Sequence, residues 1–178
     1  MHINLDASTE DHRIAKLAAA ALGLTLLEAA LPSPLPGVKP GLANIITLIV
    51  LTRFGWRAAA WVSLLRVVAG SLLLGTFLSP SFILSFSGAV ASLALLALAQ
   101  TLPARFFGPV THSILAALAH FAGQFAVVYF WLIPHAGVIN LVPIFAAAAL
   151  IFGTVNGIAA ATLLTRLPET TQTSCATS

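Results

Sequence analysis

The chain has 178 residues, of which 59% are hydrophobic and only 7% are charged, and its mean hydropathy is +1.01. Soluble domains carry about a quarter of their residues as charges, so this composition excludes one and predicts an integral membrane protein. The pI of 9.8 reflects eight Lys and Arg residues that stand singly among apolar runs, which make no basic patch for nucleic acid. The lone Cys175 predicts neither a disulfide nor a thiolate metal site.

Six apolar segments follow one another between two polar tails, residues 1–12 and 167–178. We expect one membrane domain over residues 13–166, an all-α bundle of six transmembrane helices. The expected segments are 14–31, 41–54, 57–78, 81–102, 110–133 and 138–165. The second has 14 residues and reaches only about 21 Å as a helix, whereas a full crossing needs about 20 residues.

The cations predict the orientation of the chain, because Lys and Arg in short loops stay on the cytoplasmic side. With both termini in the cytoplasm, six cations fall on that side and only Lys39 falls outside. The six are Arg13, Lys16, Arg53, Arg57, Arg105 and Arg166. The sequence therefore predicts cytoplasmic N- and C-termini.

The loop of residues 35–44 separates the first two segments and carries two prolines, two glycines, Lys39 and Asn44. Proline and glycine prevent this stretch from continuing as a helix. Because the second segment is short, the loop must enter the membrane, where irregular backbone is tolerated only if protein covers it or it lines a watery cavity. We expect a loop that faces a binding site open to the outside.

Arg66 is the costliest residue within the segments. It follows Arg57 by nine residues and so lies about 13.5 Å along the third segment, near the middle of the membrane. A central arginine costs about 2.5 to 3.5 kcal/mol on insertion scales, so it should face the bundle interior or a wet cavity. Two interpretations remain open: Arg66 binds a ligand, or it pairs with Glu28 to fix packing.

Further polar residues lie from the membrane middle to its outer half. Each has a simpler explanation, as a helix cap, an interfacial side chain or a contact between helices. Together they predict a polar cavity whose ligand-binding residues are Glu28, Lys39, Asn44, Arg66, His120, Gln124 and Asn140. His112 and Asn156 are the main polar residues of the inner half.

Small residues recur at helical spacing in the first and last segments: Ala15, Ala19 and Gly23, and Gly153, Gly157 and Ala161. Such stripes let helices approach closely. They either pack the two terminal segments within the bundle or form a docking face for another membrane protein.

Motifs for catalysis are missing from the sequence. No segment contains the clustered aspartates that hold Mg²⁺ and diphosphate in prenyl-diphosphate synthases, and no phosphate-binding loop, zinc motif or nucleophile elbow occurs. The histidines are dispersed. We therefore expect no enzyme activity, no cofactor and no metal site.

Four motifs in order carry a resemblance to a known family: residues 35–45 (LPGVKPGLANI), Leu65-Arg66 followed by Gly70-Ser71 and Gly75, Ser87-Gly88, and Ala119-His120 followed by Gly123-Gln124. Over residues 15–165 the chain resembles the bacterial Gx transporter family, also labelled heptaprenyl diphosphate synthase component I. That family is similar to the substrate-binding S components of energy-coupling-factor (ECF) transporters. Pro40 stands where the family pattern has an aliphatic residue.

The resemblance implies a six-helix subunit of the bacterial cytoplasmic membrane that captures a vitamin, cofactor or related small molecule outside the cell. It also implies a transmembrane coupling subunit and two cytoplasmic ATPases as partners, with Ala15, Ala19 and Gly23 as the docking face. Two alternatives stay open. One is a non-catalytic subunit of isoprenoid, heptaprenyl diphosphate or quinone synthesis, and the other is a purely structural assembly subunit in which Glu28 neutralises Arg66.

Overall fold

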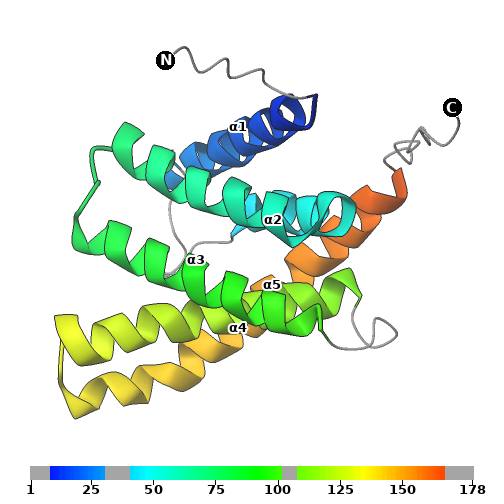
Figure 1. The fold of residues 1–178 in the computed structure, drawn as a ribbon. Helices are drawn as coiled ribbons and strands as arrows, with labels where there is room; N and C mark the ends of the chain where they lie inside the picture. The colour runs from blue at the N-terminus through cyan, green and yellow to red at the C-terminus, as the bar shows by residue number, and fades with distance from the viewer. Residues whose placement is uncertain (1–8, 31–40, 102–107, 167–178) are drawn as a thin grey trace, which may run out of the picture.

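The computed structural model describes residues 9–30, 41–101 and 108–166, and within them every regular element is helical (Figure 1). The elements are α1 (Thr9–Ala30), α2 (Leu42–Leu73), α3 (Pro80–Ala99), α4 (Pro109–Val127), the π-helix η2 (Val128–Leu132), the 3₁₀-helix η3 (Ala136–Leu141) and α5 (Val142–Arg166). The predicted all-α fold is confirmed. Four helical stretches of these residues are long and apolar enough to cross a membrane: Ala43–Leu73, Pro80–Ala99, Pro109–Leu132 and Ala136–Arg166.

Proline sets the start of two helices. Pro80 and Pro109 each occupy the first turn, where a missing backbone donor costs nothing. Before Pro80, the hydroxyl of Ser79 accepts a hydrogen bond from the backbone N–H of Phe82 at 3.4 Å. These local signals agree with the predicted starts at residues 81 and 110.

Helix α2 contains the second and third predicted segments and is broken between them. At Gly55 the backbone has φ 82° and ψ 179°, a conformation that only glycine adopts readily. Asn44 and Arg66 stand 11 residues on either side of Gly55, which would separate them by about 33 Å in a straight helix. Both line one cavity, so the chain turns back at Gly55 and α2 consists of two packed halves, 42–54 and 56–73.

The first half of α2 lies beside the second half of α5. At its start, Nδ2 of Asn156 donates to the carbonyl oxygen of Gly41 at 3.2 Å, and near its end Nη2 of Arg53 donates to the carbonyl oxygen of Leu164 at 3.0 Å. Asn156 precedes Arg166 by ten residues, or about 15 Å of helix. Helix α2 therefore begins about midway along the bundle rather than at its end.

Glycines on α5 bring that helix against α4. A Cβ at position 157 would lie 2.7 Å from Cα of Val110, and a Cβ at position 153 would lie 3.1 Å from Cα of Ile114. A glycine also brings α3 close to α4: a Cβ at position 123 would lie 2.7 Å from the carbonyl oxygen of Ser87. Gly153 and Gly157 thus pack α5 on α4 within the bundle, which agrees with the packing alternative for this stripe.

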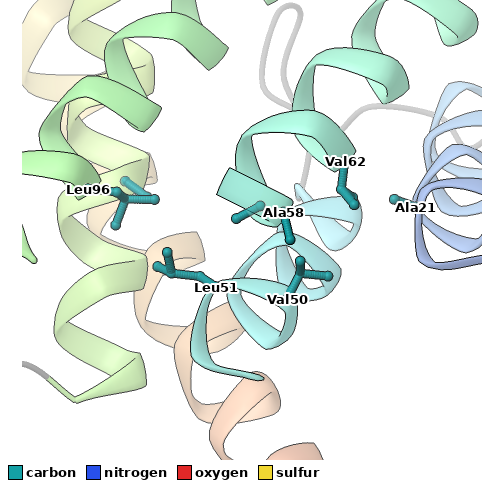
Figure 2. Close-up of a cluster of buried hydrophobic side chains, with 8 residues drawn as sticks. Ala21, Val50, Leu51, Ala58, Val62 and Leu96 are labelled. Carbon is teal, nitrogen blue, oxygen red and sulfur yellow. The ribbon is translucent and has the colours of Figure 1, made fainter. Parts of the chain in front are cut away.

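A cluster of buried apolar side chains fills one end of the bundle, and we call this the arginine end because it carries Arg53, Arg57 and Arg166. The cluster joins α1, both halves of α2, α3 and α4, and Figure 2 shows Val50 and Ala58 between Leu96 of α3 and Ala21 of α1. Its members are Ala21, Val50, Leu51, Ala58, Ala59, Val62, Leu96 and Ala116. Trp56 adds a hydrogen bond from Nε1 to the carbonyl oxygen of Leu93 at 3.0 Å. This end is closed by packed side chains.

Candidate functional site

A cavity of about 510 Å³ occupies the half of the bundle away from the arginine end. On α3 it is lined by residues of the first two turns, such as Ser81 and Ser85, whereas Leu96 near the other end of α3 belongs to the packed cluster. On α4 and α5 the lining likewise comes from the parts farthest from the arginine end. A volume of this size is within the range of small-molecule sites.

Arg66 lies in the wall of the cavity, on the second half of α2. Its Nε atom is buried and has no hydrogen-bond partner among the described residues. An unsatisfied polar atom of a charged group carries the full cost of its desolvation, so such atoms are rare in native structures. As a lining residue, Arg66 can offer a ligand in the cavity a guanidinium, the group that holds planar anions through two parallel hydrogen bonds.

Glu28, near the end of α1, is also part of the cavity wall and is only 7% exposed. Its carboxylate attracts the Arg66 guanidinium electrostatically. This attraction lowers the cost of burying both charges, although it does not satisfy the Nε atom of Arg66. Asn44, in the first turn of α2, lines the same cavity.

His120 and Gln124 lie on adjacent turns of α4 and both face the cavity. The amide nitrogen of Gln124 is 3.1 Å from Nε2 of His120. Gly88 of α3 makes room for the imidazole, since a Cβ there would lie 2.7 Å from Nε2 and 2.8 Å from Cδ2. The ring is therefore held between α3 and its own helix, close enough to Arg66 for their charges to interact.

The start of α2 is fixed by residues from two parts of the chain. Gly41 has φ 71° and ψ 31°, the left-handed conformation that favours glycine, and its carbonyl accepts from Asn156 and from the backbone N–H of Asn44. Gly41, Asn44 and Asn156 all line the cavity. The end of the predicted loop thus reaches the cavity at the level of Asn156.

Aromatic rings form the wall where α4 meets α5. Phe121 and Phe145 have ring planes 6° apart with centroids separated by 5.9 Å, and Phe125 follows Phe121 at 5.8 Å. Phe82 of α3 and Phe152 of α5 add two more rings to the lining. The cavity therefore combines a charged and amide-bearing surface with an aromatic one.

The structure brings together five of the seven predicted ligand-binding residues: Glu28, Asn44, Arg66, His120 and Gln124. Asn140 is not among the lining residues and is exposed in η3, while its neighbours Val138 and Leu141 line the cavity. Lys39 lies outside the described residues. Of the predicted docking stripe, Ala15, Ala19 and Gly23 are all exposed on α1.

Sequence reasoning missed the hydroxyl and aromatic residues of the wall and misplaced Asn156. The four-residue spacings of Ser81 with Ser85 and of Phe121 with Phe125 were available signals, because residues so spaced share one helix face. Asn156 was assigned to the inner half by its position in the last segment. Its contact with Gly41 depends on how far the loop enters the bundle, which the spacing of residues in the sequence cannot show.

Among the described residues no group of three or more His, Cys, Asp or Glu side chains is arranged to hold a metal ion.

The helices and the cavity define a multi-pass α-helical membrane protein with an internal cavity. The family model described as "Heptaprenyl diphosphate synthase component I" matches residues 17–163, and the chain belongs to this family. No curated protein and no solved structure matches the chain.

Proposed function

We propose that this protein is the substrate-binding membrane subunit of an ECF-type uptake transporter for a vitamin, cofactor or related small molecule. The observation that carries the proposal is a cavity of about 510 Å³ whose wall includes Arg66, Glu28 and three amide or imidazole side chains, those of Asn44, His120 and Gln124. A charged side chain that lines an internal cavity of a membrane protein is typical of a site that binds a polar or charged ligand.

The proposed topology has six membrane segments with both termini in the cytoplasm. The positive-inside rule puts Arg53, Arg57 and Arg166 at the cytoplasmic surface. The start of α1 and the end of α5 lie toward the same end of the bundle in Figure 1, which supports this topology. In this orientation the packed cluster closes the cytoplasmic end and the cavity opens outward.

The proposed partners are a transmembrane coupling subunit and two cytoplasmic ATPases. The sequence has no phosphate-binding loop of its own, so active uptake requires an external source of ATP hydrolysis. The exposed stripe of Ala15, Ala19 and Gly23 supports α1 as the docking face, because small residues allow a partner helix to approach closely. The chain would act without enzymatic activity of its own.

A second candidate is a non-catalytic membrane subunit of isoprenoid, heptaprenyl diphosphate or quinone synthesis. The family description and the apolar rings of the wall favour it. In this alternative a polyprenyl chain would lie against the rings and its diphosphate would lie near Arg66.

The test is to purify the full chain from its native membrane in mild detergent and to identify retained small molecules by mass spectrometry. The proposal predicts a water-soluble compound that the wild type retains and Arg66→Gln loses. Gly23→Ala, on the exposed face of α1, is the matched control and should retain the compound. A polyprenyl lipid, or no compound beyond those of membranes lacking the protein, would refute the uptake function. Recovery of an ATPase pair with the wild type tests the partners separately.

A further inference from the structure

We infer that the ligand of this cavity is an anionic aromatic molecule, in which a carboxylate or phosphate is attached to a planar ring system. This inference rests on the proposed function, since it names the chemical class that the same cavity would take. It comes from two parts of the described wall, one charged and one aromatic.

The inference that the ligand carries an anionic group comes from Arg66. Arg66 lines the cavity, and among the described residues its Nε atom has no hydrogen-bond partner, although Glu28 attracts the charge of the guanidinium. A neutral ligand oxygen would satisfy one donor, whereas a carboxylate or phosphate accepts from two donors of the guanidinium at once and also balances its charge. The cavity therefore favours an anion over a neutral polar group.

The start of α2 strengthens this preference. Helix α2 begins beside the cavity, directly after Gly41, and no side chain of the described residues caps its first turn. The first backbone N–H groups of a helix carry a partial positive charge, which stabilises a nearby anion. Arg66 and this helix start thus contribute positive potential to one cavity, against the single carboxylate of Glu28.

The inference that the ligand contains a planar ring comes from the aromatic wall between α4 and α5. Phe121 and Phe145 present nearly parallel ring planes, and Phe125 continues the same aromatic surface. Aromatic surfaces of this kind take another planar ring in an offset or edge-to-face arrangement better than they take a flexible alkyl chain. His120, beside Phe121, adds a further flat group to the lining.

The experiment uses three probes of nearly equal size that separate charge from aromaticity. They are naphthalene-2-carboxylate, the neutral naphthalene-2-carboxamide and the saturated decahydronaphthalene-2-carboxylate. Binding is measured by equilibrium dialysis against nanodiscs containing the full chain, with empty nanodiscs as the blank. We expect the aromatic carboxylate to bind at least about tenfold more tightly than either of the other two.

Two variants assign each preference to its surface. Arg66→Gln should reduce the preference for the carboxylate over the amide, and Phe121→Leu should reduce the preference for the aromatic over the saturated acid while keeping that for acid over amide. Equal binding of the acid and the amide by the wild type overturns the inference, as does equal binding of the two acids or binding no stronger than the blank. If the retained compound is soluble but lacks a charge or a ring, this inference fails while the uptake function stands.

Discussion

Leu96 of α3 is 1% exposed in the packed cluster, whereas Leu84, three turns earlier on the same helix, lines the cavity. The two leucines are about 18 Å apart along the helix and experience different surroundings. At the arginine end the first half of α2 fills the bundle, and because this half begins only after Gly41, no other described helix takes its place at the other end. A helix of half length is thus the structural origin of the cavity.

The largest expected effect comes from filling the closest helix contact. Gly157→Val would drive a side chain into the backbone of Val110, which cannot move without separating α4 from α5. We expect a loss of about 3 kcal/mol or more in unfolding free energy, measured by denaturant titration in detergent. Gly23→Val is the control, because nothing lies within 4 Å of its Cβ. Equal stability of the two variants would show that the α4–α5 contact is not close.

The comparison between the two ends of α3 is tested by a matched pair of leucine-to-alanine substitutions, one at each end. Leu96→Ala should cost about 2 to 5 kcal/mol, since it leaves a void in packed surroundings. Leu84→Ala should cost less than about 1 kcal/mol, because its side chain already faces a cavity and makes fewer contacts. Thermal unfolding of both proteins measures the difference. A larger loss for Leu84→Ala would reverse the assignment of the filled and hollow ends.

A smaller effect is expected where α2 begins. Asn156→Ala removes the donor to the carbonyl of Gly41 and should lower stability by about 1 to 2 kcal/mol. It should also weaken ligand binding, because Gly41 and Asn44 lose their anchor to α5. Thr154→Ala, which removes only an exposed hydrogen bond from the Thr154 hydroxyl to the carbonyl oxygen of Leu150 in the same helix, should change stability by less than about 0.5 kcal/mol. A variant Asn156→Ala as stable as wild type would mean that the anchor is dispensable.

The smallest effect on stability is expected at Arg66. Without ligand, Arg66→Gln should change the unfolding free energy by less than about 1 kcal/mol, because the lost attraction to Glu28 is offset by no longer burying a guanidinium whose Nε has no partner among the described residues. An arginine that fixed packing through Glu28 would instead cost about 3 to 5 kcal/mol when removed. Denaturant titration of the two ligand-free proteins separates these outcomes and decides between a ligand-binding and a structural arginine.

Much of the fold followed from the sequence because helix starts and breaks are local. Pro80, Pro109 and Gly55 interrupt apolar runs, and the structure begins or breaks helices at each of them. The convergence of Arg66, His120 and Gln124 was also predictable, since polar side chains in apolar helices must face the interior. The same argument does not hold for Asn140. This residue lies in a short 3₁₀-helix at a helix end, where the membrane no longer constrains which way a side chain faces.

The central claim is that a cavity open to water from outside the cell reaches into the half of the bundle away from the arginine end. It is tested most directly by labelling single cysteines in whole cells with a membrane-impermeant maleimide, after Cys175→Ser removes the natural thiol. Ser85→Cys lies in the cavity wall and Thr101→Cys is exposed beyond the other end of α3. We predict that intact cells label Ser85→Cys and that Thr101→Cys is labelled only after permeabilisation. The reverse pattern, or a Ser85→Cys protein that the reagent never reaches, would contradict the account.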